Sequence, residues 1–214
     1  MTLEEIRNDV LARSGPDHEI TTGQINTFIN EGYNKVIAKI VDDCQDYFGD
    51  SETITTVVGT QEYTPAKEFL TIRFVDYDPG TGTYTRCTPV PLNEIKSLQS
   101  TTSQSFTDSY PRYYLWGEKI GILPVPTTAG TVIIHGIVKP VALSSNSDEP
   151  AFLSTHHSLL TTWAMKCMVE AVDENYLDGQ RKQAEFEAGC DELLRLVGAR
   201  QSDLTKKISV TPLY

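Results

Sequence analysis

The sequence predicts an α+β fold: a four-helix bundle, made of two N-terminal and two C-terminal helices, with an inserted antiparallel β-sheet or sandwich module. Two observations predict it. Apolar residues recur at helical spacing near both ends of the 214-residue chain. The middle is instead rich in Thr, Val, Ile, Tyr, Gly and Pro, in short runs separated by turn residues. Because an isolated helix pair cannot bury both of its faces, the two pairs are expected to pack together around the insertion.

The first helix pair is predicted in residues 1–50. Its first helix begins after Thr2, with acidic residues in the first turn, and stops at Gly15. Its second helix follows a capping box that begins at Thr21, and a wide apolar stripe continues to Val41. This stripe is the most regular helical pattern in the chain.

The β module is predicted in residues 51–143. Its strands are expected, in chain order, at 52–58, 69–77, 84–90, 113–116, 119–123 and 131–138. Turn residues separate the strands, as in the loop 78–82, which contains Pro and two Gly. Residues 92–98 are expected to form one or two helical turns, and 100–109 a polar loop.

Residues 144–198 are predicted to hold the second helix pair, and 199–214 an extended tail. The last helix is expected to start near Asp178 and to end at Gly198. Helical spacing places one residue set in the core of the bundle: Val36, Ile40, Trp163, Leu193 and Leu194.

The composition restricts the possible functions. The formal net charge is −11, which argues against tight binding to DNA phosphates but allows DNA to pass an acidic wall without adhering. The four cysteines have long, irregular spacings and are expected to be free thiols in a reducing cytoplasm. The N-terminus has no apolar core of a signal peptide, and no apolar run approaches the ~20 residues of a membrane span.

Several motifs are candidate sites of chemistry, and each has a simpler structural interpretation. The loop Asp76–Gly80 hints at calcium, but Cys87 stands where a bidentate Glu is needed. The adjacent His156 and His157 point about 100° apart on a helix and cannot chelate one metal from one face. An acidic cluster is more simply a solvated surface, although a divalent ion there is left open; it comprises Asp42, Asp43, Asp46, Asp50 and Glu52. No catalytic, cofactor-binding or metal-binding residues are assigned, and no cofactor is expected.

Two alternatives from other classes remain open. One is a hydrolase or metal enzyme whose site the sequence does not reveal, which requires convergent ionisable groups in a pocket. The other is a carbohydrate-binding module that uses Tyr113, Tyr114 and Trp116 as a flat exposed patch.

The sequence also resembles the head-to-tail adaptor (connector) family of tailed bacteriophages, related to podovirus tail tubular protein A and to siphovirus first adaptors. The resemblance lies in the order of an aromatic strand, a Leu-Pro-x-Pro turn, a second strand, a Pro-rich loop and a helix. It is carried by the segments 110–126, 131–135, 140–143, 149–153 and 156–157. The two opening helices, through 3–10 and 25–33, are similar as well.

The resemblance implies a non-enzymatic structural protein of the virion neck, assembled in the host cytoplasm. It implies a homo-oligomeric ring of twelve copies beneath the portal protein, contacting a tail, nozzle or further neck protein on the other side and leaving a DNA channel. No membrane contact and no sequence-specific DNA binding are implied. A different neck component, such as a stopper or tail completion protein, remains an alternative. In such proteins the C-terminal segment reaches the portal, which implies a docking tail containing Lys206, Lys207, Ile208, Val210, Leu213 and Tyr214.

Overall fold

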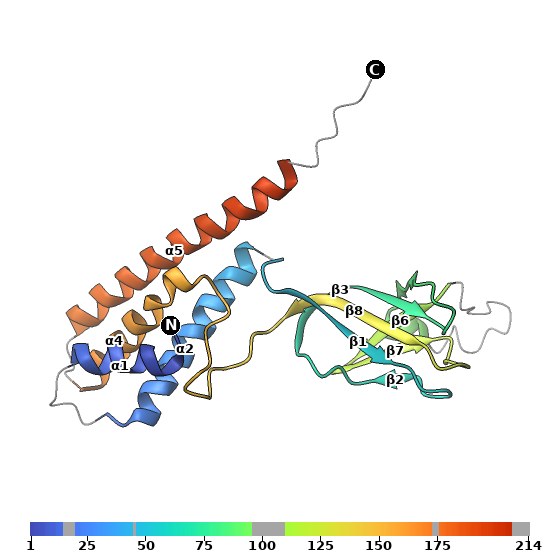
Figure 1. Cartoon of the computed structure of the whole chain (residues 1–214), viewed down its shortest axis with the longest axis horizontal. Helices are drawn as coiled ribbons and strands as arrows, with labels where there is room; N and C mark the ends of the chain where they lie inside the picture. The colour runs from blue at the N-terminus through green and yellow to red at the C-terminus, as the bar shows by residue number, and fades with distance from the viewer. Residues whose placement is uncertain (15–19, 45, 96–109, 173–175, 207–214) are drawn as a thin grey trace, which may run out of the picture. The chain divides into compact units, whose positions relative to one another are not determined.

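The computed structural model describes residues 1–14, 20–44, 46–95, 110–172 and 176–206. It is an α+β structure that divides into two compact units (Figure 1). The helical unit comprises Met1–Tyr47 and the chain from Pro140 onward, and the β unit comprises Phe48–Lys139.

The helical unit contains one 3₁₀ turn and several α-helices. They are α1 (Leu3–Ser14), α2 (Thr22–Asp43), η1 (Ser154–His156), α4 (Ser158–Val172) and α5 (Tyr176–Lys206). The capping box before α2 forms as predicted. The Thr21 hydroxyl accepts from the Gln24 N–H at 3.3 Å, and the Gln24 side chain accepts from the Thr21 N–H at 2.9 Å. Two N–H groups that the helix itself leaves unpaired are therefore satisfied, which fixes the start of α2.

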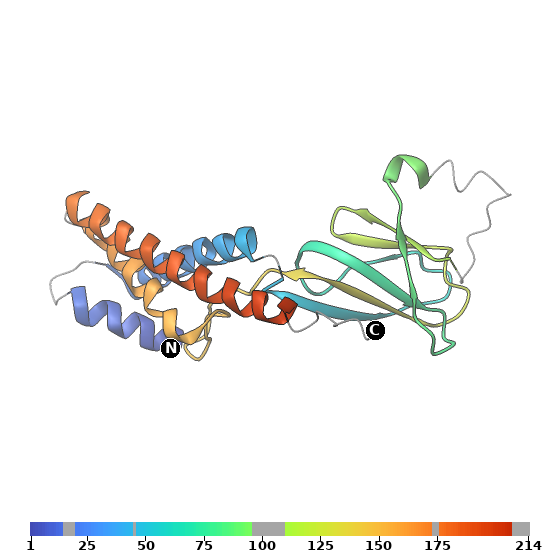
Figure 2. The same ribbon diagram turned by 90° about the horizontal axis from the view of Figure 1, so that it is seen from above.

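The predicted four-helix bundle is wrong. The helices are of very unequal length, with 12 and 15 residues in α1 and α4 but 22 and 31 in α2 and α5, and α4 lies between the other three (Figures 1 and 2). Small residues allow this arrangement. A Cβ atom on Gly32 of α2 would lie 2.8 Å from Trp163 of α4, and one on Gly189 of α5 would lie 2.3 Å from Leu159 of α4. Apolar periodicity shows which face of a helix is buried, but it does not show which helices share a core.

The expected end of the last helix at Gly198 is also wrong. Helix α5 continues through Gly198 to Lys206. A glycine that ends a helix adopts a positive φ, and Gly198 is not among the glycines with positive φ. Good helix formers follow it, including Ala199 and Arg200, so the isolated glycine only weakens the helix locally.

The β unit consists of two four-stranded sheets. In spatial order, the first contains β1 (Gly49–Thr55), β8 (Thr131–Val138), β3 (Phe69–Asp78) and β4 (Thr85–Arg86). The second contains β2 (Glu62–Tyr63), β7 (Lys119–Leu123), β6 (Arg112–Trp116) and β5 (Thr88–Pro89). The predicted strands at 119–123 and 131–138 are confirmed to the residue. The strand pairs are antiparallel except β5 with β6.

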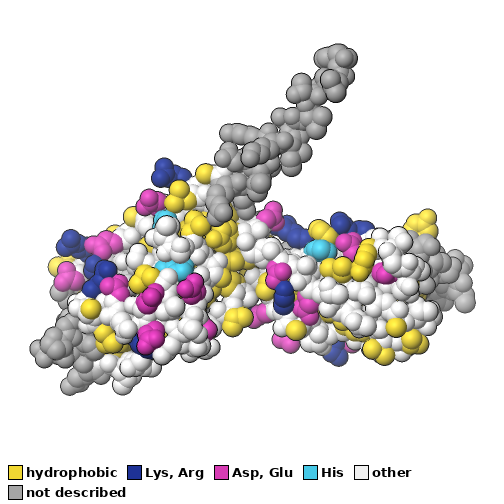
Figure 3. All heavy atoms as spheres, viewed as in Figure 1, with side chains coloured by type: hydrophobic (Ala, Val, Ile, Leu, Met, Phe, Trp, Pro, Cys, Tyr) yellow, Lys and Arg dark blue, Asp and Glu magenta, His cyan; other side chains and the backbone are white. Residues whose placement is uncertain are grey.

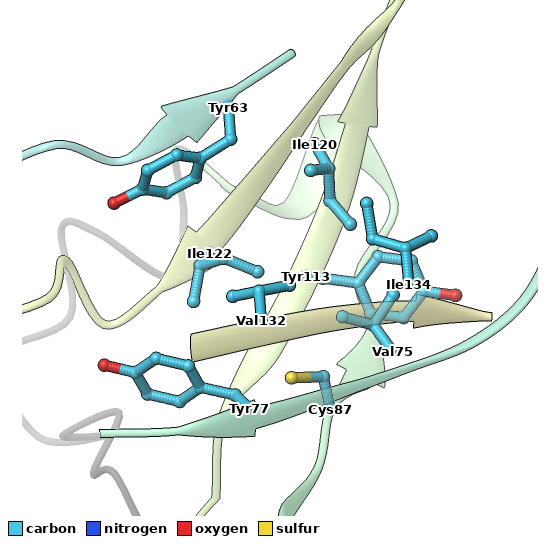
Figure 4. Packing of buried hydrophobic residues seen from close by; sticks show 9 residues of the cluster. All are labelled: Tyr63, Val75, Tyr77, Cys87, Tyr113, Ile120, Ile122, Val132 and Ile134. Carbon is cyan, nitrogen blue, oxygen red and sulfur yellow. The ribbon is translucent and has the colours of Figure 1, made fainter. Parts of the chain in front are cut away.

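The core of the β unit lies between the two sheets (Figure 4). It is a cluster of buried side chains from both: Tyr63, Val75, Tyr77, Cys87, Tyr113, Ile120, Ile122, Val132 and Ile134. The single strand expected at 84–90 is instead two short strands, β4 in the first sheet and β5 in the second. Cys87 lies between them with its side chain in the core, so this segment carries the chain from one sheet to the other.

Candidate protein-binding surfaces

The sequence left open whether the acidic side chains bind a divalent metal ion, and the structure addresses this for the residues that it describes. Among them, no three His, Cys, Asp or Glu side chains are grouped so that they could hold a metal ion. Five of the positions considered from the sequence make structural hydrogen bonds: Asp78, His156, His157, Asp50 and Glu52.

Asp78 organises the loop that hinted at calcium. Its Oδ1 accepts hydrogen bonds from the N–H groups of Gly80 at 3.0 Å and Thr81 at 2.7 Å, and its Oδ2 accepts from the N–H of Gly82 at 3.0 Å. Burial acts to raise the pKa of Asp78, but these hydrogen bonds outweigh it and leave the pKa below its ordinary value. The carboxylate is thus occupied by the turn, as in an Asx turn.

The two adjacent histidines are structural. His157 is buried, and its Nε2 lies 3.0 Å from the carbonyl oxygen of Phe152. Its Nδ1 lies 2.8 Å from the Met1 ammonium group. A ring that donates from Nε2 to the carbonyl can accept at Nδ1 from the ammonium group, so His157 joins the N-terminus to the loop before α4. His156 instead contacts the Thr155 hydroxyl at 2.9 Å.

Two members of the acidic cluster hold a loop of the β unit. Glu52 accepts hydrogen bonds from the N–H groups of Ala66 and Lys67 at 2.7 and 2.8 Å. The Lys67 ammonium group bonds to Asp50, and this bond is the largest cause of the lowered pKa of Asp50. These contacts also cover part of the outer edge of β1, where the Lys67 ammonium group donates to the Ser51 carbonyl at 2.8 Å.

The aromatic strand does not form a flat exposed platform, so it does not suit a carbohydrate. Tyr113 and Tyr114 are both buried, and only Trp116 is largely exposed. The Tyr114 ring lies on Gly121, where a Cβ atom would be 2.0 Å from it, and its hydroxyl donates to Glu62 at 3.2 Å. Burial and the Glu62 charge raise the pKa of Tyr114 to about 12.

The free thiols are not activated as nucleophiles. Burial, the largest cause in each case, raises the pKa of Cys87 to about 12 and those of Cys167 and Cys190 to about 11. Such thiols are protonated near neutral pH, whereas a reactive cysteine has a lowered pKa.

The residues that the sequence places in a helical core lie as follows. Val36, Ile40, Trp163 and Leu193 are buried, and Leu194 is half-buried. The Trp163 ring packs against Phe186 of α5, with ring centroids 4.9 Å apart. Of the predicted docking tail, Lys206 is the last residue of α5, and the remaining members lie outside the described residues.

The sequence did not predict one apolar surface of the β unit. Val57 and Val58 follow β1 and are 59% and 60% exposed, and Val125 follows β7 and is also exposed. The loops that carry them are joined by a hydrogen bond of 2.9 Å from the Gly59 N–H to the Pro126 carbonyl. We call Val57, Val58 and Val125 the apolar tip. In Figure 3, hydrophobic side chains are visible toward the end of the β unit where Figure 1 draws these loops.

The β unit also has a groove of about 730 Å³. Its lining includes Phe69, Leu70 and Ile72 near the start of β3 and Leu115 near the end of β6. Leu70 and Leu115 are exposed, so the groove presents apolar side chains to whatever enters it. The sequence predicts both strands, but the meeting of the start of β3 with the end of β6 depends on sheet packing.

Comparisons with known proteins add one finding. A family model described as SU10 adaptor protein matches residues 1–209. No curated protein matches the chain. In the part of the chain that the structure describes, every helix is too short or too polar to cross a bilayer.

Proposed function

The chain belongs to the SU10 adaptor protein family, and we propose that this phage adaptor-type structural protein links the head of a tailed phage to its tail. The family match over residues 1–209 carries the proposal. The protein forms a ring, of twelve copies, in the virion neck. One side of the ring contacts the portal protein, and the other contacts the next neck or tail protein.

The charge of the chain supports a ring that DNA crosses. A net charge of −11 repels the phosphate backbone, so a channel lined by such copies lets DNA slide without holding it.

The docking element for the portal is the C-terminal segment that begins at Lys206. It combines two lysines with four apolar side chains, Ile208, Val210, Leu213 and Tyr214. The apolar residues fill a groove or add a strand on the portal, and the lysines meet acidic groups there. Several anchors are needed together, because ordering a chain end costs conformational entropy.

The test compares three chains mixed with portal protein: the full-length chain, a chain truncated after Lys206, and a full-length Ile208→Ser/Val210→Ser/Leu213→Ser variant. Native mass spectrometry should show a ring on the portal for the first chain alone. All three should share one thermal midpoint, since the altered residues lie beyond the last described helix. If both altered chains attach to the portal with unchanged affinity, another surface of the chain binds the portal. If the full-length chain remains monomeric in the presence of the portal, the proposed adaptor function is wrong.

A further inference from the structure

We propose that the apolar tip of one copy inserts into the β-unit groove of a neighbouring copy, so that β units join head to tail around the assembly. The proposal rests on the ring proposed above and adds the surfaces that close it. Each copy then uses two different patches, one to insert and one to receive. Such a heterologous contact closes into a ring when the rotation between copies allows it.

The tip and the groove lie at opposite ends of the two sheets. In the first sheet, Thr55 and Asp78 pair with Thr131 at one end, and Thr71 pairs with Ile137 near the other. The tip follows the first of these ends, and the groove includes the second. A head-to-tail contact needs this placement, because one unit must offer its two patches in different directions.

In the second sheet, too, the tip and the groove lie at opposite ends. Leu123 pairs with Arg112 at the end that leads to Val125 of the tip. Trp116 pairs with Lys119 at the opposite end, where the groove lies. Both sheets therefore run from the groove to the tip.

The tip is held in shape before any partner arrives. Val57 to Thr60 form a turn closed by a 3.0 Å hydrogen bond, and Gly59 has φ +77°, as the third residue of a type II turn requires. The Tyr63 hydroxyl accepts from the Val57 N–H at 3.1 Å and donates to the Thr60 carbonyl at 2.7 Å. A preorganised apolar loop loses little conformational entropy on binding.

Charge favours this occupant over a basic tail or DNA. Between Thr53 and Gln61, and between Gly121 and Gly136, the sequence around the tip contains no Asp, Glu, Lys or Arg. The charged residues that line the groove are two lysines and two glutamates, Lys67, Glu68, Glu118 and Lys119, and their formal charges cancel.

Three of these lining charges are already paired. Lys67 pairs with Asp50, Glu68 with Lys139 at 3.0 Å, and Lys119 with Glu62 at 3.5 Å. An uncharged apolar loop can enter such a groove without leaving a charge unpaired, whereas a charged segment gains no net attraction.

The contact is small, so it is weak between two isolated copies and strong in a closed ring. Stable pairs bury about 1,200–2,000 Å², which three side chains and a groove do not reach. In a ring each copy is held from both sides, and the effective concentration of the tip near the groove is high.

Cross-linking tests the contact. A Val58→Cys chain and a Leu115→Cys chain are mixed with wild-type portal under the conditions of ring assembly, then oxidised. The mixture should give a disulfide-linked dimer on a non-reducing gel, and the double variant should give a ladder. A Thr53→Cys chain mixed with Leu115→Cys is the matched control, because Thr53 is exposed on β1 away from the tip. A second experiment measures ring assembly on the portal by native mass spectrometry. Val58→Asp should weaken this assembly at least about tenfold, while Thr53→Asp should not.

Several outcomes overturn the proposal. Rings that form while the Val58/Leu115 mixture cross-links no more than the control would reject it and leave the adaptor function standing. Cross-linking of Val58→Cys to itself would indicate a symmetric contact instead. Capture of the portal by Leu115→Cys would assign the groove to that partner. Monomers alone, without cross-links, would reject both this contact and the proposed ring.

Discussion

Gly32 is a point of close approach between α2 and α4. A Cβ atom there would lie 2.8 to 2.9 Å from Cδ1, Cβ and Cγ of Trp163, so the base of the indole, rather than a flexible side-chain end, would have to move. We expect Gly32→Ala to lower the stability of the helical unit by about 1–3 kcal/mol, as overpacking does. Gly23→Ala in the same helix meets only the Thr21 hydroxyl at 3.9 Å and should leave stability unchanged or slightly raised. Thermal unfolding of the two variants measures the difference, and equal midpoints would contradict the close contact.

Asp78 makes the stability of the β unit depend on pH. Its pKa in the folded chain is below the ordinary value. A carboxyl group with a depressed folded pKa contributes stability that is fully present well above the unfolded pKa of about 3.9, and the contribution is lost as the pH falls through the folded pKa. We therefore expect Asp78→Asn to unfold at a lower temperature than wild type at pH 7.

The difference between wild type and Asp78→Asn should shrink as the pH falls below about 4, where the wild-type carboxyl takes up its proton. Thermal midpoints from pH 3 to pH 7 measure it. Other carboxyl groups with lowered pKa values, such as Asp148 and Glu185, are unchanged in the variant and cancel in the comparison. A difference that is constant over this range would show that the Asp78 charge does not stabilise the loop.

At the scale of the elements, α4 organises the helical unit. Trp163 of α4 packs on Phe186 of α5 and lies against Gly32 of α2, and the Lys35 and Lys166 ammonium groups lie 4.8 and 4.7 Å from its ring centroid. One side chain of α4 thus contacts two other helices, α2 and α5. Its Nε1 is buried without a hydrogen-bond partner among the described residues, so packing and charge, not hydrogen bonding, hold the ring.

Two substitutions at Trp163 separate these contributions. Trp163→Ala should cost about 3–5 kcal/mol, because it leaves a large cavity. Trp163→Phe should cost clearly less, since it keeps an aromatic ring against Phe186 and removes the N–H that has no partner. Denaturant unfolding gives both values. A Trp163→Ala midpoint close to that of wild type would mean that α4 is not the centre of the unit.

At the scale of the whole molecule, the β unit has its own core and adjacent ends. The cluster between its two sheets draws only on residues of that unit. The Val138 N–H donates to the Phe48 carbonyl at 3.0 Å, so the two points where the chain enters and leaves the unit lie side by side. A segment with these two properties is expected to fold by itself.

We expect a fragment of residues 46–140 to be folded and to unfold cooperatively. Calorimetry and circular dichroism of the fragment should show a transition that matches one transition of the full chain. Trp163→Ala in the full chain should lower the other transition and leave this one in place, because Trp163 belongs to the helical unit. An unfolded fragment would show instead that the β unit needs the helices.

Local patterns in the sequence were sufficient to predict the local features of this protein. Alternation and turn residues predicted β7 and β8 to the residue, and the hydroxyl and amide of Thr21 and Gln24 predicted the capping box. Each depends on residues a few positions apart, which is why a single sequence was sufficient. The order of aromatic, Pro-containing and helical segments also indicated a phage adaptor, and the family match supports that class of protein.

Features that depend on residues far apart in the chain became apparent only in the folded structure. It replaced the four-helix bundle with helices around α4, because close approaches at Gly32 and Gly189 set the packing and periodicity does not record them. It placed Tyr113 and Tyr114 in buried positions on opposite sides of one strand instead of a shared platform. It also brought the loops after β1 and β7 into one apolar tip, through a hydrogen bond between Gly59 and Pro126. Residues far apart in the chain meet only when the sheets form, so no local pattern in the sequence could have predicted that surface.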